Sequence, residues 1–167
     1  MDLSTLVRTF LEIALLRTPP HAVPASSVLL GLVLALHWAV GFANGLLSLP
    51  SAAAAGSSLV GTLVVVAFVH GALVFTGRGA RTPQTLSALA GCEVLVGLLA
   101  LPILATLQGG EAGPGGLVLL VLIGWNLAIA SHVFRYALEL PLAGAVVVAL
   151  GYMVVGFVVM DLALPRP

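Results

Sequence analysis

Long apolar runs constrain this chain more than any other feature of its sequence. They lie near 27–48, 57–77, 85–107, 117–137 and 142–162 and hold about 20 residues each. A helix of that length is about 30 Å long, which matches the hydrocarbon core of a bilayer. Only 7% of the residues are charged, whereas a soluble domain carries roughly 25%. The sequence therefore predicts an all-α integral membrane protein with five transmembrane helices.

The segments between the runs have the composition of turns. They are rich in glycine and proline and lie at 49–51, 77–83, 108–116 and 139–141. Transmembrane strands would alternate apolar and polar residues, and stretches such as 59–69 do not. Because the connections are short, neighbouring helices are expected to pack antiparallel. A four-span arrangement, with the first or the last run re-entrant, is the alternative.

The first 20 residues have a different pattern. Between residues 3 and 16, apolar side chains such as Leu6 and Phe10 recur on one helical face, and Arg8 and Glu12 fall on the other. Asp2 or Ser4 could cap this helix. We assign 1–20 to an amphipathic helix in the membrane interface and 21–167 to the five-span domain. A helix that binds a partner, or a simple lead-in to the first span, are the other interpretations.

Arginine placement predicts the orientation. All six cationic residues are Arg. With the N-terminus in the cytoplasm, only Arg166 falls outside, and five fall inside: Arg8, Arg17, Arg78, Arg81 and Arg135. This is the positive-inside bias. We therefore expect a cytoplasmic N-terminus and a periplasmic C-terminus, with Arg78, Arg81 and Arg135 as cytoplasmic anchors.

A few polar residues lie within the runs, where hydrocarbon makes them costly. They are His37, Asn44, His70, Glu93, Asn126 and His132. A charged side chain at the centre of a span costs about 2.5 kcal/mol or more, so such residues usually face the interior and find partners. Counted from the helix ends, His70, Glu93 and His132 lie at a similar depth, and His37 and Asn126 lie nearer the midplane. We therefore predict an intramembrane polar cluster around Glu93.

Small residues share helical faces with these polar groups. Gly41 and Gly45 accompany His37 and Asn44, Gly97 accompanies Glu93, and Gly124 and Ala128 accompany His132. Small side chains let helices approach closely, so Gly41, Gly45, Gly97 and Ala128 are predicted packing positions. The deep aromatic residues Trp38, Trp125 and Tyr152 are expected to pack inside, with their N–H or O–H groups bonded to nearby acceptors.

Three interpretations of the polar cluster stay open. It could be structural, with interhelical hydrogen bonds worth about 0.6 kcal/mol each. It could be a proton or ion pathway, or a site for a ligand or metal. No catalytic motif is present, and the single cysteine, Cys92, allows neither a disulfide nor a multi-cysteine metal site. A net charge of zero gives no support for nucleic-acid binding. We expect no enzyme activity, no cofactor and no metal.

The layout resembles the bacterial members of the Ypt-interacting-protein (Yip) family of five-span membrane proteins. The similarity lies in the basic loop 78–83, the following 84–86, Gly91, the pair Leu101–Pro102, and the stretch 125–135. It covers about residues 20–162 and is carried mostly by hydropathy. The long cytosolic N-terminal region of the eukaryotic members has no counterpart, so their binding of small GTPases is not carried over.

The resemblance implies a non-catalytic role in the bacterial inner membrane. We expect a scaffold or an accessory subunit of a membrane assembly, acting through the bilayer, other membrane proteins or copies of itself. The alternative is a small transporter, channel or proton-coupled factor that uses Glu93, His70 and His132.

Overall fold

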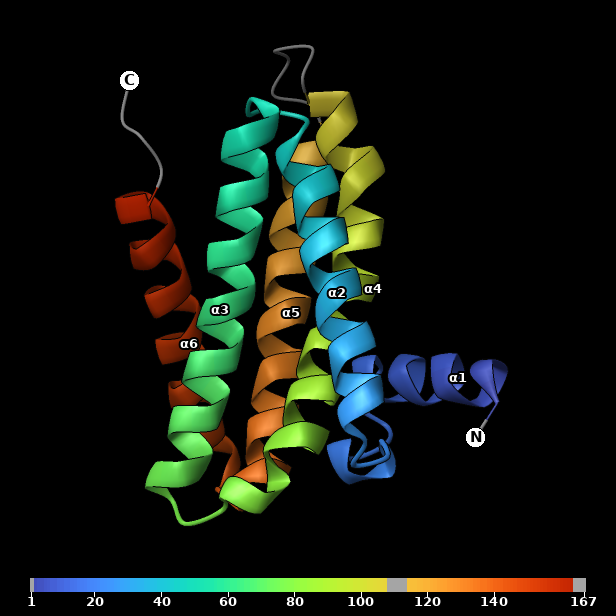
Figure 1. The fold of residues 1–167 in the computed structure, drawn as a ribbon, viewed down its shortest axis with the longest axis vertical. Coiled ribbons are helices and arrows are strands. Elements are labelled where there is room, and N and C mark those ends of the chain that lie inside the picture. Colours follow the sequence, from blue (N-terminus) through green and yellow to red (C-terminus); the bar gives the residue numbers. More distant parts are fainter. Residues whose placement is uncertain (1, 108–113, 164–167) are drawn as a thin grey trace.

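The computed structural model describes residues 2–107 and 114–163, and within them every regular element is a helix. The α-helices are α1 (Leu3–Ala14), α2 (Ser27–Gly45), α3 (Ser51–Phe75), α4 (Thr82–Leu107), α5 (Gly115–Ala137) and α6 (Leu142–Ala163), with short 3₁₀ turns at Pro20–Ala22 and Gly79–Arg81 (Figure 1). The five helices α2 to α6 are long and apolar enough to cross a membrane. The expected all-α architecture is confirmed at this level.

The observed helix bounds follow the predicted runs, with one clear difference. α3 begins at Ser51, directly after Pro50, whereas its apolar run was predicted to begin near 57. The alanine-rich stretch 52–55 explains the difference, because alanine is the best helix former even where hydropathy alone is modest. Most of the predicted 108–116 connection lies outside the described residues.

The five long helices form a bundle with α4 near its centre. α4 contacts α2, α3 and α5, while α3 and α6 lie side by side although they are far apart in the sequence. The first half of α4 is the most buried segment, with residues 85–92 all enclosed by their neighbours. Since Glu93 follows this segment directly, the fold places an acid in the interior.

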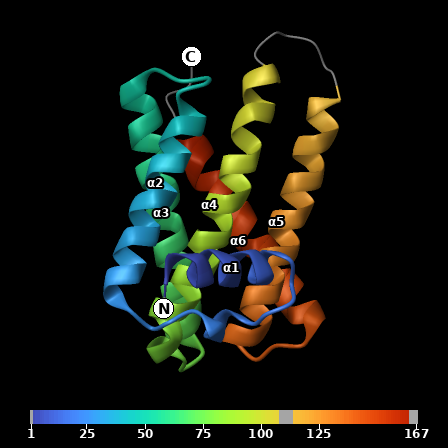
Figure 2. The same cartoon turned by 90° about the vertical axis from the view of Figure 1, so that its right-hand side faces the viewer.

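α1 lies across the bundle, close to the end that carries the α3–α4 and α5–α6 turns (Figures 1 and 2). Asp2 caps it by accepting a hydrogen bond from the Thr5 amide at 2.9 Å. The Phe10 ring lies against Gly91 of α4, where a Cβ would come within 2.5 Å of the ring. Only glycine leaves room for α1 to dock this closely.

α1 presents three faces, because successive residues turn by about 100° around a helix. Phe10 and Ile13 are buried against the bundle. One flank is apolar but exposed, with Leu3 at 74% and Leu11 at 47%. The polar flank carries Arg8, whose side chain pairs with Glu12 at 2.9 Å. This arrangement suits a helix with hydrocarbon on one side and water on the other, and its interfacial position stays a prediction.

Side chains of the bundle also hold the end of α1 and the segment that follows it, by bonding their backbone carbonyls. Trp125 donates to the Ala14 carbonyl at 2.8 Å, and Gln84 donates to the Val23 carbonyl at 3.0 Å. His132 Nε2 lies 3.0 Å from the Thr18 carbonyl. The Ala14 carbonyl is at the C-terminal end of α1, where helical carbonyls lack a partner within the helix. We call these three contacts the carbonyl clamp.

Candidate functional site

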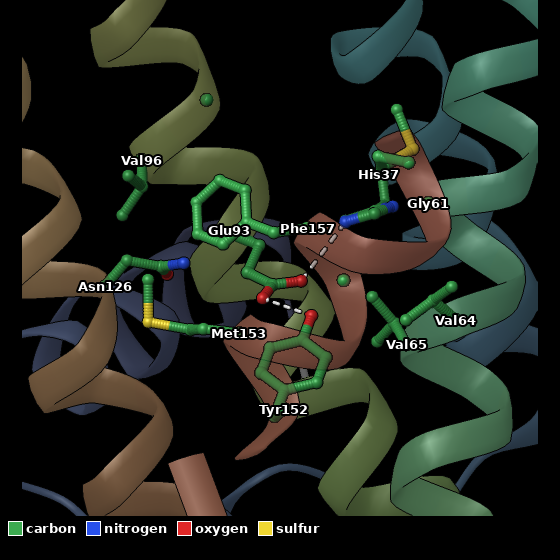
Figure 3. A pocket seen from close by; sticks show the side chains of 13 residues that line it. His37, Gly61, Val64, Val65, Glu93, Val96, Asn126, Tyr152, Met153 and Phe157 are labelled. Atoms are coloured by element: carbon green, nitrogen blue, oxygen red, sulfur yellow. Dashed lines mark hydrogen bonds and ion pairs between the residues drawn. The ribbon is translucent and has the colours of Figure 1, made fainter. Parts of the chain in front are cut away.

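Glu93 is the centre of the candidate site, and both of its carboxylate oxygens are engaged (Figure 3). His37 Nε2 of α2 lies 3.1 Å from Oε2, and the Tyr152 hydroxyl of α6 donates to Oε1 at 2.7 Å. The side chains of His37 and Glu93 are 17% and 10% exposed. Three helices thus converge on one acid, as expected for an acid enclosed in an apolar bundle.

The hydrogen-bond chain continues to α3 and fixes the orientation of the imidazole. His37 Nδ1 lies 2.9 Å from Thr62 Oγ1, and the Thr62 hydroxyl donates to the Ser58 carbonyl, also at 2.9 Å. A hydroxyl has one proton, and a carbonyl can only accept. The Thr62 oxygen must therefore accept, so that His37 Nδ1 carries a proton and donates it. This tautomer is assigned from the hydrogen-bond network.

The tautomer limits how many protons His37 Nε2 and Glu93 Oε2 can share. With Nδ1–H committed to Thr62, a hydrogen bond between Nε2 and Oε2 requires one proton between them. That proton makes a neutral pair when it is on Glu93 and an ion pair when it is on His37. The two side chains together are uncharged in either state.

A cavity of about 380 Å³ adjoins the Glu93 carboxylate. Its walls are mainly apolar, with Val64, Val96, Met153 and Phe157 among them. Asn126 of α5 points towards Glu93 from the opposite wall (Figure 3). Asn126 Oδ1 is buried and has no hydrogen-bond partner among the described residues. The site therefore combines one acid, one imidazole and one amide in a mainly apolar pocket that is open on one side.

The structure brings together some members of the predicted cluster. Glu93 and His37 are in contact, and Asn126 lines the same cavity. Asn44 instead joins α2 to α4, by donating to the Gly97 carbonyl at 3.1 Å. That bond is interhelical and structural.

His70 and His132 are corrections to the predicted cluster. His70 Nδ1 lies 3.3 Å from Thr82 Oγ1 in an exposed position, and His132 belongs to the carbonyl clamp. Their depth matches that of Glu93, but depth along a helix leaves open its rotation about its own axis. The histidine that reaches Glu93 is His37, which the sequence places nearer the midplane.

Tyr152 and Thr62 are site residues that the sequence did not identify as such. Tyr152 was expected to pack with its hydroxyl on a nearby acceptor, and that acceptor is Glu93. The signal was available, because Glu93 is the one acid deep within the apolar runs. Thr62 carries no comparable signal, since threonine in a span commonly bonds its own helix. The other two deep aromatic residues, both tryptophans, donate to carbonyls, Trp125 as described and Trp38 to Ala55 at 3.4 Å.

Three of the four predicted packing positions lie at close helix contacts. A Cβ on Gly41 would come 2.5 Å from Ser58 Oγ, and one on Gly45 would come 3.1 Å from the Ala54 Cβ. A Cβ on Gly97 would come 2.8 Å from Val40 Cγ1. Ala128, the fourth position, lines a groove between α5 and α6 and stays a prediction as a packing residue. Gly124 lines the same groove, and a Cβ added there would have no other atom within 4 Å.

The predicted anchors Arg78 and Arg81 connect two turns at one end of the bundle. Arg78 and Arg81 donate to the Glu139 carboxylate at 2.8 and 2.6 Å. Arg81 also donates to the Ala137 carbonyl at the end of α5, at 3.3 Å. The hydrogen bonds from Arg78 and Arg81 hold the pKa of the Glu139 carboxyl below its usual 4.5, and the bond from Arg78 has the larger effect. Arg135, the third predicted anchor, has no acid partner among the described residues.

Glu139→Gln is expected to lower the melting temperature at neutral pH and to leave it almost unchanged in acid. Because the folded-state pKa lies below 4.5, the arginine contacts stabilise the fold above that pH. The stabilisation is lost as the pH falls through the folded-state pKa. Melting in detergent at pH 7 and pH 3 measures the difference. Since Glu139 is exposed, about 1 M salt should reduce the difference in melting temperature between the variant and the wild type at pH 7. An equal fall in melting temperature at pH 7 and pH 3 would contradict the prediction.

The donor set does not suggest a metal centre. Within residues 2–107 and 114–163, no three His, Cys, Asp or Glu side chains are grouped closely enough to hold a metal ion. The Yip-family resemblance rests on the sequence pattern alone and stays a prediction. No protein-family model, curated protein or solved structure matches the chain.

Proposed function

We propose that the chain is a five-span protein of the bacterial inner membrane, with its N-terminus in the cytoplasm, that binds a small cation with an apolar body in exchange for a proton. The observation that carries this proposal is the one-proton contact between His37 and Glu93 at the wall of the cavity. The five described arginines support the orientation. Arg8 and Arg17 belong to the α1 segment, and the other three lie at the same end of the bundle, Arg78 and Arg81 in the α3–α4 connection and Arg135 in the last turn of α5.

The exchange follows from charge. Loss of the shared proton leaves lone pairs on Nε2 and Oε2 facing each other across 3.1 Å, beside a carboxylate without a counter-charge. An uncompensated charge in an apolar interior is costly. A cation in the cavity restores neutrality, so the proton and the cation compete for Glu93.

The cavity walls define the rest of the ligand. Met153, Met160 and Phe157 offer polarisable and aromatic surface, and an aromatic face attracts a cation. Asn126 supplies the other polar group, from α5. A ligand that matches these walls has one positive charge and an apolar body of moderate size.

Tetraphenylphosphonium is a suitable probe, because it is a monocation with a wholly apolar surface. We expect the purified protein in weakly buffered detergent to release close to one proton for each tetraphenylphosphonium bound. Calorimetry in buffers of different ionisation enthalpy counts those protons. Neutral triphenylphosphine oxide serves as the control and should release none. Cation binding without proton release would contradict the proposed exchange.

The scaffold or accessory-subunit role is the second candidate, and exposed apolar surface on α6 favours it. Phe157 is 64% exposed, Val158 52% and Leu162 73%. A helix from another membrane protein, or from a second copy, could cover this surface and the mouth of the cavity. A pull-down in mild detergent tests this role. Recovery of one abundant partner, by the Glu93→Gln variant as well as by the wild type, would favour the scaffold or accessory-subunit role over cation exchange.

A further inference from the structure

A second cavity, of about 480 Å³, lies between α5 and the beginning of α6. Gly124 and Ala128 of α5 contribute to its lining, and the small side chains leave open space there. Leu16, after α1, and Leu142 and Val146 of α6 also line it. We call this cavity the α5–α6 groove. It contains none of the residues that contact Glu93.

The groove has a charged end. Arg135 and Tyr136 line it near the end of α5, with the Arg135 Cζ 5.8 Å from the centre of the Tyr136 ring. No acid among the described residues pairs with Arg135, whereas Arg8, Arg78 and Arg81 each have a carboxylate partner. The guanidinium is therefore available to an anion from outside the chain.

Nearby contacts restrain the aromatic ring at this end. The His132 ring meets the Tyr136 ring edge-on, with centroids 5.0 Å apart, and His132 is itself bonded to the Thr18 carbonyl. The Tyr136 hydroxyl makes no hydrogen bond within the described part of the chain. A guanidinium and a phenol thus stand together as donors for an anion.

Polarity changes along the groove as it does along a lipid. Gly124 and Arg135 are 11 positions apart on α5, which corresponds to about 16 Å of helix. The donors are at the end of the bundle that carries the α3–α4 and α5–α6 turns. From there the apolar lining extends towards the bilayer midplane. A phosphate at Arg135 would therefore place an acyl chain over Gly124 and Ala128.

We propose that the α5–α6 groove binds one anionic phospholipid from the leaflet at the arginine-rich end of the bundle. A phospholipid supplies both the phosphate that neutralises Arg135 and the chain that fills the apolar part. A helix from another protein would need an acid placed opposite Arg135 to do the same. The proposal requires insertion in a membrane, but it does not depend on cation binding at Glu93.

Native mass spectrometry of the full chain tests this site, with phosphatidylglycerol and phosphatidylcholine added in equal amounts. We expect one phosphatidylglycerol to be retained, and Arg135→Gln to reduce its retention at least tenfold. Gly124→Leu, which fills the groove and keeps the arginine, should reduce it to a similar extent. Arg78→Gln and Gly71→Leu are matched controls, since Arg78 is paired and Gly71 lies in open space outside the groove. Both controls should retain the lipid.

The remaining outcomes are also decisive. Glycerol phosphate should fail to displace the lipid, and displacement would mean that an anion alone fills the site. If Arg135→Gln loses phosphatidylglycerol while Gly124→Leu retains it fully, the lipid is held only by charge attraction at the surface, and the groove is not its binding site. Equal retention of phosphatidylglycerol and phosphatidylcholine would also overturn the proposed site. Arg135→Lys keeps the charge and should retain the lipid, and its melting temperature controls for misfolding. Loss in this variant with an unchanged melting temperature would also overturn the site.

Discussion

Glu93→Gln is expected to leave the fold intact and to weaken tetraphenylphosphonium binding by more than about 100-fold. The glutamine carbonyl can accept the hydrogen bond from Tyr152, and its amide can donate to His37 Nε2, which carries a lone pair when Nδ1–H is bonded to Thr62. The variant therefore imitates protonated Glu93. It cannot supply the negative charge that the cation needs.

The size of this effect follows from the cost of an unpaired charge in an apolar interior. Removing one partner of a buried charge pair costs about 3–5 kcal/mol, which is two to four orders of magnitude in the dissociation constant. Titration with radiolabelled tetraphenylphosphonium at pH 8 measures the affinity, and a melting curve checks the fold. Proton release should also disappear in this variant.

Tyr152→Phe is the matched control for Glu93→Gln. It removes one hydrogen bond to the same carboxylate and keeps the acid. We expect a loss of stability of about 1 kcal/mol and an affinity within a few-fold of wild type. Wild-type affinity in Glu93→Gln would refute a role for this carboxylate in cation binding and leave the cluster as a structural contact.

Gly91→Leu is expected to displace α1 from the bundle. A Cβ at this position already comes 2.5 Å from the Phe10 ring, and a whole leucine side chain occupies the volume of that ring. Overpacking of this kind costs about 1–3 kcal/mol. Loss of the Trp125–Ala14 hydrogen bond adds roughly 1 kcal/mol. Together these costs should undock the helix rather than unfold the bundle.

Cys92 reports the undocking directly. It is fully buried, and its sulfur lies 3.6 Å from the Phe10 carbonyl. We expect N-ethylmaleimide to alkylate Cys92 at least about tenfold faster in Gly91→Leu than in the wild type, which matches a loss of about 1.4 kcal/mol in docking. Gly71→Leu adds the same side chain to an open position and should leave the rate unchanged. An unchanged rate in Gly91→Leu would show that α1 is not what protects the thiol.

The length and hydropathy of the apolar runs were sufficient to predict the five long helices. A chain in hydrocarbon must satisfy its backbone within each segment, so a long apolar run has few other options. Helix bounds were harder where composition was mixed, as at Ser51, because alanine and serine are neither strongly apolar nor strongly polar. The periodicity of residues 3–16 predicted a helix there, and the structure has one at Leu3–Ala14.

The site was less predictable, because contacts between helices depend on how each helix is rotated. Depth placed His70 and His132 with Glu93, yet the partner is His37. Small residues were a better guide, since Gly41 marks the α2 face towards α3 and Gly97 marks the α4 face towards α2. Gly124 and Ala128 show the limit of that rule, because a small-residue stripe can also leave a groove open. The docking of Phe10 on Gly91 joins positions 81 apart, and no local pattern encodes it.

The carbonyl clamp also has a consequence for biogenesis. The Trp125 that holds the end of α1 is 111 positions further along the chain. At about 5–20 residues per second, a ribosome needs roughly 6–22 s to make that length. For all of that time the clamp on the end of α1 cannot form, even after Gly91 of α4 has been made. An apolar flank that rests on the membrane surface would keep this helix folded and close by until its receptor emerges.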